Sequence, residues 1–552
     1  MARQTAGLDG DRRLASMGDS GYVRSMNQPP VFVLAGALST VVFAGVGCSG
    51  GSPGATSQPA ATSPSSPTVS DGRPTFHGLP LSATSAATVA AVAESREHVD
   101  LESVTRAYEV AVRATDTEPG SILAWLQRAD ASLSPTEINE ATTRAVELSA
   151  TANAVEKQLL EIRLARNAGD TDRALAAARK LVDLAPKSAE AHFTLSRVLT
   201  LRGQDTDART AALDGLRLQP DSLSGHALLG ESYTFREPRD LQKAAHHFKK
   251  TVELRPAIAA AYVSLGDVYR AGLDLEAAAI EYGRAIEADA SYPVSPIKRG
   301  HVNSFLGHYR QARADYDAGI ALGTTRMASS LSSYRAFVSI HEGKPEAALV
   351  ELTQLSQKIA NVSLPEGERL ELAADALRNR AIVALHLAER DQPAPGALAV
   401  AESTVQEYGQ MLQLVGAAAG DQSGRRKAEA TAAYWRSRLH LAAGDLARAL
   451  EQAEAHRAAV QSETSPRKLD LYHELRGLIA LHKKEHGTAV DHLRKSDLQT
   501  DVFAKYHLAV ALSASGRGDE ARRLYREVAD WSFNSPYYAL LRRSAGERAT
   551  LE

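Results

Sequence analysis

Cysteine is nearly absent from this sequence, which has a single one, Cys48, among 552 residues. One cysteine excludes a disulfide framework and any zinc site built from four cysteines. Aromatic residues are also scarce, at 5%, while helix-favouring residues are abundant, so the composition favours helix over sheet. The 63 basic and 66 acidic residues nearly balance, with a formal net charge of −3. That balance argues against a nucleic-acid-binding protein that depends on a large positive charge.

Long apolar runs are rare as well, and the one uncharged example is Val31–Val46. It is shorter than the about 20 residues of a membrane-spanning helix, and it fits the apolar region of a secretory signal. The run ends in Gly45-Val46-Gly47-Cys48. This junction resembles a bacterial lipoprotein signal, although the family prefers a large apolar residue where Gly45 stands. The resemblance implies a leader over 1–48, a lipid on Cys48 and an extracytoplasmic, membrane-anchored protein.

Alternatives remain open at this end of the chain. Gly45 and Gly47 also fit ordinary signal cleavage, and an uncleaved apolar segment would itself be an anchor. Met17 or Met26 could be the true start in place of Met1. Residues 49–70 carry no charge and no large apolar side chain that could anchor a core, so we expect a disordered linker over 49–90.

Helical patterns repeat through the rest of the chain. One unit contains Leu229-Gly230 and Tyr233, then Ala244, Phe248 and Pro256, and the next contains Leu265-Gly266 and Tyr269, then Ala278 and Tyr282. These residues resemble the tetratricopeptide repeat, a helix–turn–helix unit of about 34 residues. The resemblance implies an all-α fold, a right-handed superhelix of antiparallel helix hairpins.

The small residue of the second helix sets the register of the repeats. It recurs every 33 to 36 residues, at Ala107, Ala141, Ala174, Ala208, Ala244, Ala278, Ala312 and Ala348. We therefore expect a repeat array over 91–365, a divergent hairpin over 366–425, and repeat-like units with a capping helix over 426–552.

Side chains that face the concave groove in this family are candidates for binding a partner. Carried over to this sequence, the candidates are Phe193, Arg197, Glu231, Val263, Asp267, Arg270, Ile297 and His301. Asp267 and Arg270 are three apart on one helix and are placed to pair with each other. Chaperone-binding members hold a carboxylate with Lys and Asn at the positions that are Val263 and Asp267 here, so that function is not implied.

Motifs of catalysis are missing from the sequence, which has no HExxH, no phosphate-binding GxxxxGK[ST] and no GxSxG. His482 and His486 are four apart on an expected helix, but a solvated face is the better explanation than a metal site. We predict a non-catalytic scaffold or adaptor of the bacterial envelope that binds a protein or peptide, with no cofactor, metal or nucleic acid. The alternative is an accessory protein of polysaccharide export or envelope biogenesis.

Overall fold

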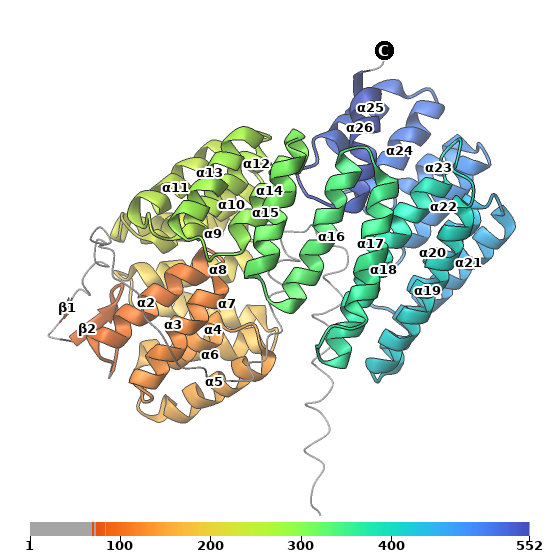
Figure 1. The fold of residues 1–552 in the computed structure, drawn as a ribbon. Coiled ribbons are helices and arrows are strands. Elements are labelled where there is room, and N and C mark those ends of the chain that lie inside the picture. Colours follow the sequence, from red (N-terminus) through yellow and green to blue (C-terminus); the bar gives the residue numbers. More distant parts are fainter. Residues whose placement is uncertain (1–68, 71–72, 83, 551–552) are drawn as a thin grey trace, which may run out of the picture. The chain divides into compact units, whose positions relative to one another are not determined.

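The computed structural model describes residues 69–70, 73–82 and 84–550. These residues divide into two compact units, and the boundary along the chain lies between Leu322 and Gly323. The predicted all-α fold is confirmed, since successive helices form hairpins through both units (Figure 1). The leader, the apolar run Val31–Val46 and Cys48 lie outside the described residues. Among the residues that are described, no helix combines the length and apolar character that crossing a bilayer requires.

The N-terminal unit starts with three short antiparallel strands and continues in helix hairpins. Its elements are β1 (Val69–Ser70), β2 (Arg73–Phe76), β3 (Leu79–Pro80), α2 (Ala86–Asp100), α3 (Val104–Thr117), α4 (Ile122–Ala131), α5 (Pro135–Glu147), the 3-10 turn Leu148–Ala150, α6 (Ala154–Asn167), α7 (Thr171–Leu184), α8 (Ala189–Leu201), α9 (Asp205–Leu218), α10 (Leu223–Phe235), α11 (Leu241–Leu254), α12 (Ala259–Ala271), α13 (Leu275–Ala288), α14 (Val294–Leu306) and α15 (Tyr309–Leu322).

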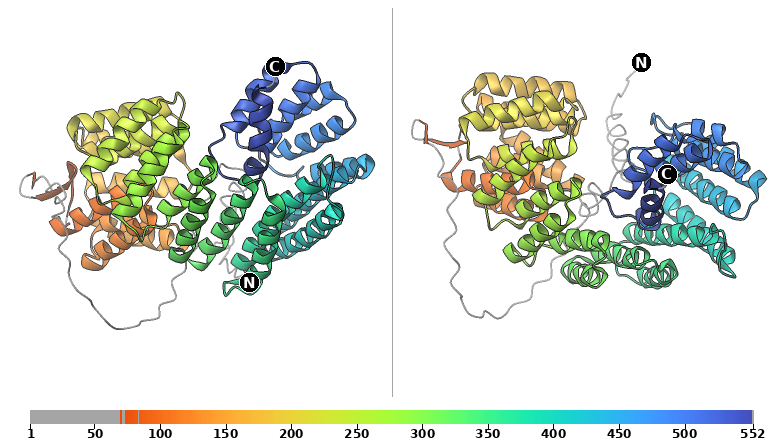
Figure 2. Two further views of the ribbon diagram at one scale, coloured as in Figure 1. Left: turned by 45° about the horizontal axis from the view of Figure 1, so that its top comes forward. Right: turned by 90° about the horizontal axis from the view of Figure 1, so that it is seen from above.

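The C-terminal unit consists of helices only. They are α16 (Thr325–His341), α17 (Pro345–Ile359), α18 (Glu366–Ala388), α19 (Ala397–Ala418), α20 (Gln422–Ala442), α21 (Leu446–Ala459), α22 (Asp470–His482), α23 (His486–Leu493), α24 (Val502–Ala514), α25 (Gly518–Ala529) and α26 (Pro536–Thr550). The last helix, α26, contacts α16 and α18 as well as α24 and α25. Figure 2 gives the hairpin stacking within each unit from two other directions.

The regularly spaced alanines form a buried layer in which the helices pack against each other. All eight alanines lie in the second helix of a hairpin and are at most 1% exposed. The first helix contributes the matching small residue. A Cβ added at Gly230 would lie 2.7 Å from the Phe248 ring, and one at Gly266 would lie 2.6 Å from the Tyr282 ring. The helices of a hairpin are therefore as close as the aromatic ring between them allows.

The prolines of the repeat have a second role in the turn between hairpins. Their carbonyl oxygens accept a hydrogen bond from the ring nitrogen six residues later, as in Trp125 to Pro119, at 2.8 Å. His192 and His226 make the same contact with Pro186 and Pro220. At Pro119, Pro186 and Pro220 this contact fastens the start of the following first helix to the end of the preceding hairpin, whereas Tyr262, six residues after Pro256, has no ring nitrogen to make it.

The N-terminal segment differs from the expected linker over 49–90. Strands β2 and β3 form a hairpin whose two turn residues, His77 and Gly78, both have positive φ, as a type I′ turn requires. Phe76 and Leu79 are buried in the core of the unit, with 2% and 0% exposure. Ordered structure therefore begins well before residue 90, and it belongs to the N-terminal unit.

That segment crosses the starts of several first helices. Ser188 donates to the carbonyl of His77 at 2.9 Å, and Asn153 donates to the carbonyl of Pro80 at 2.9 Å. Glu156 accepts the backbone N–H of Ser82 at 3.1 Å. The helix array thus holds the β2–β3 hairpin and Ser82 partly through backbone groups and partly through side chains, since the Ser82 hydroxyl also donates to Glu156.

Candidate functional site

First helices of successive hairpins enclose a cavity of ≈ 270 Å³ in the N-terminal unit. Helices α2, α4, α6, α8 and α10 contribute most of its lining, and the strand residue Phe76 completes it. Helix α2 contacts both α4 and α10, so the first hairpin reaches across to a later one. The cavity is therefore the inner face of the array, which the α2 segment helps to enclose.

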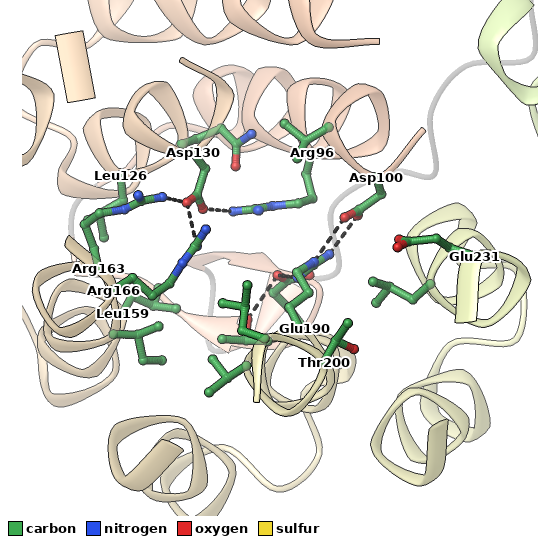
Figure 3. Close-up of a pocket in the computed structure, with 18 of the residues that line it drawn as sticks. Arg96, Asp100, Leu126, Asp130, Leu159, Arg163, Arg166, Glu190, Thr200 and Glu231 are labelled. Atoms are coloured by element: carbon green, nitrogen blue, oxygen red, sulfur yellow. Dashed lines mark hydrogen bonds and ion pairs between the residues drawn. The ribbon is translucent and has the colours of Figure 1, made fainter. Parts of the chain in front are cut away.

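One end of the cavity is cationic, because three arginines surround a single carboxylate (Figure 3). Asp130 pairs with Arg96 at 2.6 Å and with Arg166 at 3.0 Å, and it also pairs with Arg163. Burial, followed by repulsion from the neighbouring guanidiniums, lowers the pKa of Arg163 to about 9 and that of Arg166 to about 10. One carboxylate balances only one of these three charges.

The middle of the cavity holds Arg197 between two carboxylates. Its guanidinium pairs with Asp100 at 2.7 Å and with Glu190 at 2.8 Å. Burial alone would lower the pKa of Arg197, but these two carboxylates raise it above its ordinary value. The contact also ties α2 to α8.

Glu102 and Glu231 form the acidic end, and neither carboxylate has a hydrogen bond or ion pair among the described residues. Burial and the nearby charge of Glu102 raise the pKa of Glu231 to about 7, although Arg236 lowers it in part. Glu102 lines the same end and is exposed to solvent. Two carboxylates against the single guanidinium of Arg236 leave an excess of about one negative charge at this end.

The eight predicted groove residues divide into two groups. Arg197 and Glu231 line the cavity together. The other six candidates are at most 9% exposed and are packed inside the unit instead of lining the cavity: Phe193, Val263, Asp267, Arg270, Ile297 and His301. Phe193, for example, is fully buried, and its ring fills the space beside Gly215 and Gly225.

Asp267 and Arg270 do pair as predicted, at 3.0 Å, but in a buried network. Lys298 approaches Asp267 at 3.0 Å and the Tyr282 hydroxyl donates to it at 2.7 Å. Burial alone would raise the pKa of Asp267, yet Lys298 and Arg270 lower it to about 2. His301 similarly makes a buried hydrogen bond, 2.6 Å from the Tyr316 hydroxyl. Lys298 joins two neighbouring hairpins through Asp267, and the other contacts lie within one hairpin, so these buried groups serve packing.

The histidine pair weighed as a metal site is divided between two helices. His482 ends α22 and His486 begins α23, so they are not four apart on one helix as expected. His492 lies instead 3.0 Å from His473, measured between the two Nδ1 atoms. Within 69–70, 73–82 and 84–550 no group of three or more His, Cys, Asp or Glu side chains is suited to hold a metal ion.

Sequence reasoning missed the cationic end of the cavity. Arg96 lies on α2, in a region that the consensus describes poorly, and Asp130 comes from α4. Arg163 and Arg166 are three apart on the first helix of a hairpin, and this spacing was the available signal.

The fold and this inner face define a helical-hairpin repeat protein, a class that binds partners on concave surfaces. Residues 159–222 and 229–293 match the tetratricopeptide repeat family. The chain therefore contains tetratricopeptide repeats, and such folds are typically non-catalytic scaffolds for protein interactions. No curated protein matches the chain.

Three of the solved structures that match this chain are the following. A tetratricopeptide repeat protein from Parabacteroides merdae is 15% identical over 59% of this chain and 98% of that one, with a TM-score of 0.34. PilF of Pseudomonas aeruginosa is 17% identical over 40% and 100%, with a TM-score of 0.30. YrrB, described as having an unusual peptide-binding site, is 16% identical over 37% and 100%, with a TM-score of 0.28. Similarity at this level identifies no partner for the present chain.

Proposed function

We propose that this protein is a non-catalytic scaffold of the bacterial cell envelope that binds a protein or peptide partner. One observation carries the proposal: the first helices already hold the β2–β3 hairpin and Ser82 of the same chain in part through backbone groups. Ser188, Asn153 and Glu156 bond backbone groups of that segment, while the Ser82 hydroxyl also donates to Glu156 and the Phe76 and Leu79 side chains are buried in the core. A partner segment of different sequence could be held in the same way.

The address is part of the same proposal. The apolar run, the small residues before Cys48 and the uncharged segment after it support a lipid anchor and an extracytoplasmic location, in the periplasm or at the cell surface. Cys48→Ala is expected to move the protein from the membrane to the soluble fraction. Mass spectrometry of a mature N-terminus without lipid on Cys48 would disprove the lipoprotein assignment.

Partner binding is tested by photo-crosslinking in living cells. A photoreactive residue at Thr200 or Glu231, both of which line the cavity, should yield an adduct with another polypeptide. The same residue at Lys249, an exposed position on α11, is the control. Adducts of equal yield at all three positions, or no adduct at Thr200 and Glu231, would show that the partner does not bind at the inner face.

Membership of a polysaccharide-export or envelope-biogenesis assembly is the alternative role. The identity of a crosslinked polypeptide distinguishes it from a general adaptor.

A further inference from the structure

The cavity of the N-terminal unit separates its charges into two ends. Arg96, Arg163 and Arg166 share Asp130 at one end, which leaves an excess of about two positive charges there. At the opposite side of the cavity in Figure 3 lies Glu231, which has no partner among the described residues. Glu102 belongs to the same acidic end. A ligand that satisfies both ends must carry an anion and a cation.

We propose that this cavity binds a free peptide of two or three residues, with its carboxylate at the arginine cluster and its amino group at Glu102 and Glu231. Guanidinium groups suit a carboxylate because they present paired N–H donors in a plane. An ammonium group between two carboxylates relieves their mutual repulsion. Neither end would be satisfied by a simple anion or a simple cation alone.

The length of the ligand follows from α2 and the residues just after it, which run from Arg96 at the arginine cluster, past Asp100 in the middle of the cavity, to Glu102 at the acidic end. Arg96 and Asp100 are separated by about 6 Å along the helix axis, and Glu102 lies two residues farther along the chain. An extended peptide spans about 3.3–3.6 Å per residue. Two or three residues therefore bring the two termini of the ligand to the two ends of the cavity.

The rest of the lining accepts apolar side chains. Leu126 and Leu159 project into the cavity in Figure 3, and Leu201 and Leu228 also line it. A volume of ≈ 270 Å³ lies just below the range of about 300–1,000 Å³ of small-molecule sites. The cavity therefore suits a short length of peptide, free or part of an extended partner chain, rather than a folded domain.

Buried polar atoms along the lining lack partners, and this is independent evidence of a ligand. Gln127 is 1% exposed; its amide nitrogen donates to Ser95, while its Oε1 has no partner within the described part of the chain. Glu190 is 2% exposed, and its second carboxylate oxygen also has no hydrogen-bond partner within the described part of the chain. Backbone N–H groups of a bound peptide are suitable donors for both oxygens.

This ligand differs from the partner proposed above, since both of its ends lie inside the cavity. The two ideas fail separately, because one is tested by crosslinking in cells and the other by titration of the purified protein.

The test is calorimetric titration of the full-length protein with trialanine and three relatives of it. N-acetyl-trialanine lacks the amino charge, trialanine amide lacks the carboxylate, and pentaalanine is too long, at about 17 Å. Trialanine is expected to bind, and each of the other three should bind at least about tenfold more weakly. Absence of trialanine binding at millimolar concentration, or acetylation or amidation that changes the affinity less than about twofold, would overturn the proposal.

Two variants assign the ends. Arg166→Gln keeps the size of a side chain that is 38% exposed, so the fold should tolerate it, and Glu231→Gln removes only a charge. Amidation of the peptide should matter less for Arg166→Gln than for the native protein, and acetylation should matter less for Glu231→Gln, because Arg96, Arg163 and Glu102 remain. Arg173→Gln, at an exposed position on α7, is the control and should bind like the native protein. Equal sensitivity of all variants to both modifications would contradict the assigned orientation and the proposal with it.

Discussion

Gly266 permits a direct test of the packing between the two helices of a hairpin. In Gly266→Ala the new Cβ would lie 2.6 Å from Cε1 and 2.8 Å from Cδ1 of Tyr282. Carbon atoms in contact prefer about 3.5–4.0 Å, so the ring must move by about 1 Å. Tyr282 has no exposed surface, and its hydroxyl donates to Asp267 at 2.7 Å, so the movement also disturbs the buried ion pairs.

Overpacking of this kind costs about 1–3 kcal/mol. A weakened hydrogen bond to a carboxylate adds up to about 1.5–3 kcal/mol, and the better helix propensity of alanine returns about 1 kcal/mol. Gly283→Ala is the matched control on α13 of the same hairpin, because the nearest atom to its Cβ is Arg299 Nη1 at 3.7 Å. That variant should gain up to about 1 kcal/mol, so the two should differ by about 2–4 kcal/mol.

Urea denaturation measures the difference, and hydrogen exchange locates it in α12 and α13. Tyr282→Phe, which removes only the hydroxyl, separates the lost hydrogen bond from the displaced ring. If Gly266→Ala were as stable as Gly283→Ala, the close approach of these helices would not be what requires glycine.

Three other substitutions test separate parts of the molecule. The pKa of Glu231 is raised to about 7 in the folded protein, so its ionisation lowers the free energy of unfolding as the pH rises from about 4.5 to 7. Glu231→Gln cannot ionise and should therefore be about 1–3 kcal/mol more stable than the native protein at about pH 8. At about pH 4 the two proteins should be equally stable, as melting curves would report. Leu79→Ala removes a fully buried side chain, so it should cost about 2–5 kcal/mol and make the 73–85 segment sensitive to limited proteolysis, while an unchanged cleavage pattern would mean that the segment is not held by its core contacts. The Arg438 side chain is 2% exposed, pairs with Glu389 and donates to the Tyr537 hydroxyl of α26. Arg438→Ala should cost about 3–5 kcal/mol of stability and speed hydrogen exchange in α26. Full protection of α26 in that variant would argue against Arg438 as the residue that holds this helix.

The hairpins were predictable because their packing is local in sequence. An alanine, a glycine and an aromatic residue recur at fixed spacing, and each contacts the other helix of its own hairpin. Phe248 beside Gly230 and Tyr282 beside Gly266 are contacts that the repeat pattern contains. The hairpin expected over 366–425 consists mainly of α18 and α19, and the prolines of the segment 391–395 lie in the turn between them.

The cavity was not predictable in the same way, because its contacts join distant hairpins. Arg197 and Asp100 are 97 residues apart, and Arg255 and Glu97 are 158 residues apart. Such pairs depend on how far the array curves, which a pattern of about 34 residues does not determine. The strand pair at 73–80 did carry a signal, since His77-Gly78 between Phe76 and Leu79 suits a two-residue turn.

The ion pair between Arg255 and Glu97 has a consequence for how the N-terminal unit folds. In an open array each hairpin stabilises only its neighbours, so the array can lengthen or shorten one hairpin at a time. Here Glu97 of α2 pairs with Arg255, which is synthesised much later. The strand hairpin likewise cannot make its hydrogen bond to Ser188 until that residue has been synthesised. The beginning of the unit therefore cannot complete its contacts until most of the unit exists. Loss of an internal hairpin would leave two mismatched ends instead of a shorter array.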